Sequence, residues 1–115
     1  MNYCPQKLFL PSLREKVVIS GVKAIRAFAF AGCLGISQVI IGDDVEKIGE
    51  GAFFACVGLN SVTIGKNVRA IGDNAFGGCT GLISVYNKSS LKIVKGKDCF
   101  GKVAYYARRV YCDKT

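Results

Sequence analysis

Residues 41–63 read IGDDVEKIGEGAFFACVGLNSVT, and residues 64–86 read IGKNVRAIGDNAFGGCTGLISVY. Residues 18–40, VISGVKAIRAFAFAGCLGISQVI, repeat the same pattern once more, so the period is 23 residues. A constant period of this length is typical of a solenoid, in which each repeat forms one coil and stacked coils bury a continuous core. Seven columns are identical in all three repeats, and they begin at Val22, Ile25, Ala29, Phe30, Cys33, Gly35 and Val39.

The last part of each repeat has the pattern of a half-buried strand. In the middle repeat, Leu59, Val62 and Ile64 are apolar and the residues between them are polar, which predicts a strand over 59–64. Equivalent strands are expected over 36–41 and 82–87. A glycine precedes each strand, where the chain must turn sharply.

A short helical turn is expected between the strands. In the third repeat it spans 72–76, where Asp73 can cap the turn and Phe76 enters the core. Phe30, Phe53 and Phe76 occupy the same column, so we expect the three rings to form a central part of the core.

The cysteines follow the repeat and not a disulfide framework. Cys33, Cys56 and Cys79 recur at the repeat period, and the sequence contains no C-x-x-C pair and no histidine. A zinc site therefore has almost no support. Equivalent side chains of stacked coils point the same way, which disfavours disulfide geometry, so we expect these three thiols to be buried, reduced and stacked. The redox states of Cys4, Cys99 and Cys112 stay open.

Known catalytic arrangements are missing. Without histidine, Ser-His-Asp and Cys-His arrangements cannot form, and no glycine-rich phosphate-binding motif occurs. The acidic cluster Asp43, Asp44 and Glu46 lacks the ligand spacing of an EF-hand, so we interpret it as a solvated loop. We expect a protein that is not an enzyme and that needs neither a cofactor nor a metal ion.

The pattern V-x-x-I-G-x-x-A-F-x-x-C-x-G-L-x-S-V-x-I over residues 18–86 resembles the BspA-like, or treponemal-type, leucine-rich repeats. The stretches 85–91 and 101–107 also resemble the closing segment of bacterial members. The resemblance implies an α/β solenoid, a right-handed leucine-rich-repeat superhelix with a parallel β-sheet on its concave face and short helical turns on its convex face. It also implies a bacterial cell-surface or secreted protein with a role in adhesion, although no signal peptide is recognisable in this chain.

The chain is expected to form a single domain, 1–115, whose two ends cover the open ends of the core. Residues 1–17 suit an N-terminal cap or a partial repeat. Residues 87–115 suit a degenerate fourth repeat followed by a capping helix. The residues expected to cover the core are Leu8, Leu10 and Leu13 at the first coil, Leu91 and Val94 in the fourth repeat, and Val103, Tyr106, Ala107 and Val110 along the apolar stripe of the helix.

The positive charge lies near the C-terminal end of the chain. The net charge is +8, yet residues 18–86 carry five basic and five acidic side chains, whereas residues 87–115 carry eight Lys or Arg against two Asp. Such a segment is usually a solvated flank, but it can attract polyanions. Lys102, Arg108 and Arg109, on the outer face of the expected helix, are the residues that would do so.

Two functions stay open at this point. The first is protein binding by the concave sheet, through outward residues that vary between repeats. The second is binding of a polyanion, a glycosaminoglycan or nucleic acid, by the basic segment; nucleic acid has weak support because no aromatic platform accompanies the basic residues. No apolar run is long enough to span a membrane. The outward residues expected on the concave sheet are Gln38, Ile40, Ser61, Thr63, Ser84 and Tyr86.

Overall fold

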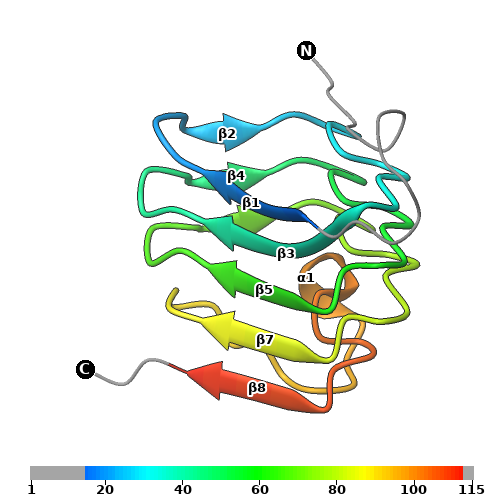
Figure 1. Ribbon diagram of the computed structural model, residues 1–115. Coiled ribbons are helices and arrows are strands. Elements are labelled where there is room, and N and C mark those ends of the chain that lie inside the picture. Colours follow the sequence, from blue (N-terminus) through cyan, green and yellow to red (C-terminus); the bar gives the residue numbers. More distant parts are fainter. Residues whose placement is uncertain (1–14, 113–115) are drawn as a thin grey trace.

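The computed structural model describes residues 15–112, which wind into stacked coils around one core (Figure 1). Each coil contributes one strand to a five-stranded sheet in which all neighbours are parallel, and consecutive coils contribute neighbouring strands. In order across the sheet, the strands are β1 (Glu15–Ile19), β3 (Ile36–Ile41), β5 (Ser61–Ile64), β7 (Ser84–Asn87) and β8 (Arg109–Cys112).

A second, smaller parallel sheet lies behind the first (Figure 1). Its strands are only two residues long, namely β2 (Ala24–Ile25), β4 (Lys47–Ile48) and β6 (Ala70–Ile71). The one helix in the described residues is α1 (Cys99–Lys102), and Phe100, Gly101 and Lys102 within it have positive, non-helical φ angles. The molecule is therefore a parallel β-solenoid, and the expectation of an α/β solenoid with helical turns is wrong in that respect.

Inter-coil hydrogen bonds explain why the turns are not helical. The amide of Phe30 donates to the Ala52 carbonyl at 2.7 Å, and the amide of Phe53 donates to the Ala75 carbonyl at the same distance. These amides are therefore not available for the bond to the fourth preceding carbonyl that defines an α-helix. In addition, each turn contains a residue in the left-handed region: Phe28 (φ 58°), Gly51 (φ 60°) and Asn74 (φ 56°).

The register of the large sheet follows the repeat from β3 onward. Val39 pairs with Val62, and Val62 pairs with Val85, at the spacing of 23 residues that the sequence predicts. The first strand is offset by one residue, because Ile19 and not Val18 pairs with Ile41. A shift of one residue moves a side chain to the other face of a sheet. Val18, which the repeat alignment places in a core column, is 58% exposed.

Phenylalanine rings fill the middle of the core. The centroids of the Phe30 and Phe53 rings are 5.3 Å apart, those of Phe53 and Phe76 are 5.1 Å apart, and both pairs are stacked. Phe53 and Phe76 are fully buried, whereas Phe30 in the first coil is half-buried. The predicted column of phenylalanines is thereby confirmed as part of the core.

The cysteine column is buried as expected, but it is not uniformly reduced. Cys56 and Cys79 are free thiols that donate to the Phe30 carbonyl at 3.1 Å and the Phe53 carbonyl at 3.0 Å, respectively. Cys33 is disulfide-bonded, so the prediction of a reduced thiol is wrong at that position. The repeat spacing argues against bonding within the column and carries no information about partners elsewhere. Cys99 and Cys112 are free and exposed.

Close stacking of the turns requires glycine at Gly51 and Gly58. A Cβ on Gly58 would lie 2.6 Å from the Leu34 carbonyl oxygen of the preceding coil. At Gly51 a Cβ would overlap the ring of Phe28, which covers the glycine from the neighbouring turn. Phe28 departs from the repeat pattern, yet its backbone keeps the left-handed conformation of Gly51 and Asn74, so the turn of the first coil has the same local form.

The C-terminal segment forms a further coil and not a capping helix. Val110, expected on a helix, lies in β8 and pairs with Val85. Val103 and Ala107 are buried in the turn before β8. The prediction fails because apolar residues spaced three and four apart also suit a tight turn followed by a strand, and the free edge of β7 offers backbone partners to a strand.

The fourth coil begins with a buried polar residue that the repeat does not predict. Asn87 occupies the column of Ile41 and Ile64, and it is only 2% exposed. Its Nδ2 donates to the Leu91 carbonyl at 2.8 Å, and its Oδ1 accepts from the Ser89 amide at 3.0 Å, so the buried amide is satisfied within the turn.

Two predictions about the ends have different outcomes. In the fourth coil Leu91 packs against the core, but the buried residue after it is Ile93, whereas Val94 is exposed. The residues expected to cover the first coil, Leu8, Leu10 and Leu13, lie outside the described residues.

Candidate functional site

The outer face of the five-stranded sheet carries two columns of side chains. Successive residues of a strand point to opposite faces, so every second residue of a strand shares this face. Gln38, Ser61 and Ser84 are paired in register across β3, β5 and β7. Ile40, Thr63 and Tyr86 are paired in the same way two residues further along these strands. The structure therefore places all six predicted site residues side by side on one face.

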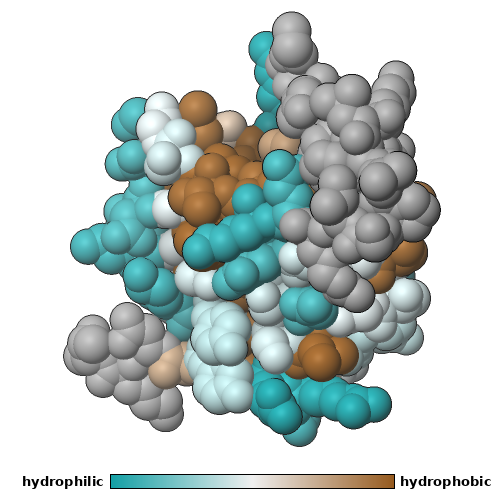
Figure 2. Space-filling model, in the orientation of Figure 1, coloured by the Kyte–Doolittle hydropathy of each residue, from teal (hydrophilic) through white to brown (hydrophobic). Residues whose placement is uncertain are grey.

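Strands β1 and β8 extend both columns beyond the predicted residues. The polar column consists of Lys16, Gln38, Ser61, Ser84 and Arg109. The apolar column consists of Val18, Ile40, Thr63, Tyr86 and Tyr111. Figure 2 shows this face, with apolar side chains gathered near β1 and more polar ones over the later strands.

Sequence reasoning missed Lys16, Val18 and Tyr111 because neither outer strand was expected. In β1 the burial of the side chains alternates along the strand, although the sequence Glu-Lys-Val-Val-Ile does not alternate between polar and apolar residues. Val17 and Ile19 of β1 pack against the core on either side of the exposed Val18, and Val110 of β8 lies between the exposed Arg109 and Tyr111. Because residues 17–19 are all apolar and the alternation at 109–111 is only three residues long, the sequence pattern did not indicate either strand.

Two tyrosine rings form the largest aromatic group on this face. Tyr86 and Tyr111 stack with ring centroids 4.8 Å apart and an angle of 10° between the ring planes. They are 41% and 46% exposed, so each ring keeps a large accessible surface while its neighbour holds it in place. Rigid aromatic side chains of this kind are enriched among residues that contribute most to binding energy.

The predicted basic patch is divided between separate elements. Arg109 begins β8 and lies in the polar column, and Arg108 directly precedes it. Lys102 ends α1, where its Nζ lies 5.6 Å from the centroid of the Tyr105 ring. Because the helix over 103–110 does not form, these three cations do not share a helix face.

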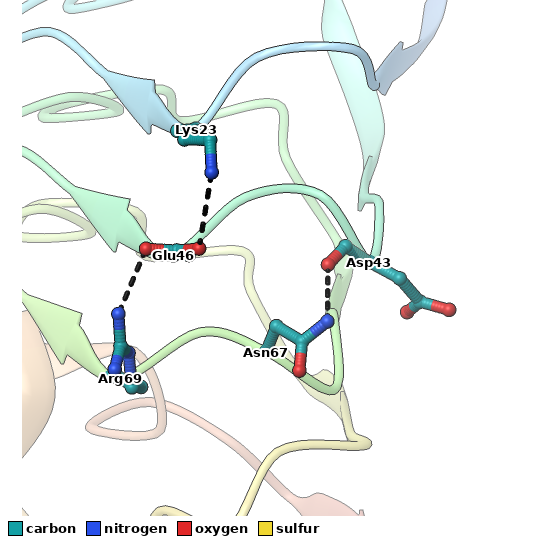
Figure 3. Close-up of polar contacts among 5 residues, drawn as sticks. All are labelled: Lys23, Asp43, Glu46, Asn67 and Arg69. Atoms are coloured by element: carbon teal, nitrogen blue, oxygen red, sulfur yellow. Dashed lines mark hydrogen bonds and ion pairs between the residues drawn. The ribbon is translucent and has the colours of Figure 1, made fainter.

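Asp43 and Glu46 of the acidic cluster lie between β3 and β4, where they contact neighbouring coils (Figure 3). Asp44 Oδ2 accepts from the Gly21 amide at 3.0 Å, and Asp43 Oδ1 accepts from the Lys66 amide at 3.3 Å. In addition, Asn67 Nδ2 donates to the Asp43 carbonyl at 2.7 Å. The loop that was interpreted as merely solvated therefore joins successive coils.

Glu46 connects three coils through its carboxylate. Its Oε1 lies 2.8 Å from a terminal nitrogen of Arg69, and its Oε2 lies 3.9 Å from the Nζ of Lys23 (Figure 3). Lys23, Glu46 and Arg69 belong to consecutive coils, so opposite charges alternate along this edge. Exposed ion pairs each contribute little to the free energy of unfolding. Their main effect here is that the Glu46 carboxylate is paired within the molecule.

Within residues 15–112, no group of three or more His, Cys, Asp or Glu side chains is placed to hold a metal ion. In the same part of the chain, no helix has both the length and the apolar character needed to cross a bilayer.

The stacked coils and the sequence together define a leucine-rich-repeat solenoid. The sequence matches the family described as "BspA type Leucine rich repeat region (6 copies)" over residues 5–106. The chain therefore belongs to the BspA-type leucine-rich repeat family, as its repeat pattern indicates. Leucine-rich repeats are in general protein-interaction modules without catalytic activity.

Among solved structures, the chain is similar to the leucine-rich repeat protein TpLRR of T. pallidum. The two are 20% identical with a TM-score of 0.34, and the match covers 84% of this chain and 68% of that one. No curated protein matches the sequence.

Proposed function

We propose that the chain is a non-catalytic module that binds another protein through the outer face of its five-stranded sheet. The observation that carries the proposal is the pair of outward columns, which run uninterrupted across five strands and include the stacked Tyr86 and Tyr111. The inward columns are uniform because stacking constrains them, whereas the outward columns are free to vary with a ligand. On a bacterial cell or after secretion, this binding would serve adhesion.

The alternative of polyanion binding by the basic C-terminal segment is not favoured. Lys102, Arg108 and Arg109 were expected together on one helix face, and the chain forms β8 at that place instead, so these cations lie on separate elements. Arg109 then becomes part of the sheet face itself.

Site-specific photocrosslinking tests the proposal. A benzophenone amino acid is placed at Thr63, in the centre of the apolar column, and in a matched control at Lys47, which is exposed on the small sheet. In the presence of candidate surface and secreted proteins, a specific cross-linked product is expected from position 63 and not from position 47. Ile40→Asp and Tyr86→Ala should each lower its yield. Equal yields from both positions, or a product that resists both substitutions, would contradict the proposal.

The same two substitutions have to leave the fold intact for this test to be valid. Both side chains are on the outer face, so the melting temperature should fall by no more than about 5 °C, which corresponds to about 1 kcal/mol in a domain of this size.

A further inference from the structure

We infer that the part of this face around Tyr86 and Tyr111 binds an acidic polypeptide segment, one that carries an apolar side chain beside its carboxylates. The inference rests on the proposed function and adds the chemistry of the partner. It follows from where the charges lie on the molecule.

Over residues 15–112, the outer face of the large sheet contains cations but no carboxylate. Neither column includes Asp or Glu over the described strands, while Lys16 and Arg109 stand at opposite ends of the polar column. Glu15 is also in the large sheet, but it pairs with the fully buried Ile36, and its Oε1 is buried. In the part of the chain that the structure describes, the carboxylates outside this sheet lie on the connecting segments and are Asp43, Asp44, Glu46, Glu50, Asp73 and Asp98.

The cations of this face are not neutralised within the described chain. Among residues 15–112 the ion pairs are those of Glu46 with Lys23 and Arg69, on a different edge. Arg109 and Lys88 are both exposed and form no ion pair there. Asp43, Asp44 and Glu46 contact neighbouring coils, and no described carboxylate pairs with Arg109 or Lys88, so the positive field of this face is left for a ligand.

The positions of these cations relative to the tyrosines indicate how a ligand would lie. Arg109 precedes Tyr111 by two residues on the same face of β8, and Lys88 follows Tyr86 by two residues just beyond β7. The stacked rings therefore have a cation on either side along the strand direction. A segment crossing the rings would place an apolar side chain on them and carboxylates at both cations.

This arrangement fits a polypeptide better than a uniformly charged polymer. An arginine side chain can bind a carboxylate with two parallel hydrogen bonds. Exposed ion pairs contribute little energy each, so apolar contact with the rings has to supply most of the affinity, while the charges select and orient the partner. A polyanion without apolar groups would leave the rings and Ile40 uncovered.

Titration of the full chain with three probes tests this inference. The first is a short synthetic peptide in which Glu alternates with Leu and Phe, the second is the same peptide with Gln in place of Glu, and the third is heparin. The Glu peptide should bind at least about tenfold more tightly than the Gln peptide. It should also shift the NMR resonances of both tyrosine rings.

Charge variants identify the residues involved. Arg109→Gln and Lys88→Gln should each weaken binding of the Glu peptide about two- to fivefold, as expected for exposed ion pairs. Lys95→Gln is the matched control, because it removes the same charge from the same coil at an exposed position outside the sheet, and it should leave binding unchanged. Tyr111→Ala should weaken binding by about tenfold or more.

The outcomes separate the inference from the proposed function. Equal affinity for the Glu and Gln peptides overturns the inference. The inference is also overturned if the chain binds heparin and Lys95→Gln weakens that binding as much as Arg109→Gln does. If these results occur while position 63 still yields a specific cross-linked partner, the proposed function stands without the acidic ligand. If position 63 yields no specific partner and the Glu peptide leaves Tyr86 and Tyr111 unperturbed, both fail.

Discussion

The thiol of Cys79 is fully buried and lies beside Cys56, with its hydrogen directed to the Phe53 carbonyl 3.0 Å away. The hydrogen bond with Cys56 and the burial of the side chain together hold the pKa of Cys79 well above the ordinary value of 9.0. The Cys79 thiol therefore stays uncharged in the folded state, whereas the same hydrogen bond lowers the pKa of Cys56. Sequence periodicity predicted the burial of these thiols, but it could not reveal the disulfide at Cys33, because a disulfide depends on spatial contacts that the repeat does not encode.

Alkaline pH should destabilise the fold through Cys79. In the unfolded chain this thiol ionises as the pH rises through 9.0, while the folded state keeps it protonated, so the unfolded state binds fewer protons and stability falls. The contribution is fully present below that pH and decreases by about 1.4 kcal/mol per pH unit above it.

Urea unfolding between about pH 8 and pH 10 measures this contribution when the parent is compared with Cys79→Ala. The alanine variant lacks the ionisable group, so its free energy of unfolding should fall less steeply with pH. Parallel curves for the two proteins would show that Cys79 ionises in the folded state as readily as in the unfolded one.

At the scale of elements, β8 is the clearest example of a segment whose secondary structure is determined by its neighbours and not by its own sequence pattern. The spacing of Val103, Ala107 and Val110 suits an amphipathic helix when the segment is considered alone. In the folded chain, the amides of Arg108 and Arg109 both donate to the Ile83 carbonyl, at 2.9 and 3.0 Å. The neighbouring strand thus provides backbone partners that an isolated sequence window does not contain, and this is why the helix could not be excluded from sequence.

Nuclear Overhauser effects distinguish the two structures of this segment. A parallel β7–β8 pair predicts contacts between backbone protons of Val85 and Val110 and their neighbours, because these residues are paired in register. A helix predicts instead contacts between residues three apart over 103–110. Observation of the helical set, without contacts between 85 and 110, would contradict the strand.

At the scale of the whole molecule, the sequence predicted the solenoid and the residues of its core, because stacking requires the same residue at equivalent positions. It also predicted six residues of the outer face, because the strands that carry them lie within the repeats. It did not predict the outer strands, where the repeat breaks down, and therefore missed that the face spans five strands and includes Tyr111. The short strands of the small sheet were also missed, because two residues are too few for a detectable alternation.

The stability of the whole molecule should depend strongly on Phe53, the middle ring of the core. Phe53→Ala removes a fully buried side chain with a stacked ring on each side, and it should cost about 3–5 kcal/mol. That is a large part of the roughly 5–15 kcal/mol typical of a domain. Thermal or urea unfolding gives the value directly.

The adjacent Phe54 supplies the matched control for this measurement. Its side chain is exposed, so Phe54→Ala should change the free energy of unfolding by no more than about 0.5 kcal/mol. Similar losses for the two substitutions would mean that the ring stack is not the centre of the core.

The hydrogen bonds that join one coil to the next have a mechanical consequence. They run along the axis of the stack. When the first and last coils are pulled apart, the hydrogen bonds of one coil therefore break before those of the next, and not all at once. An interface arranged in this way opens like a zipper, at low force and in successive steps. Each released coil frees 23 residues, or about 80 Å of extended chain. A molecule that holds a partner under flow would therefore lengthen before it lets go.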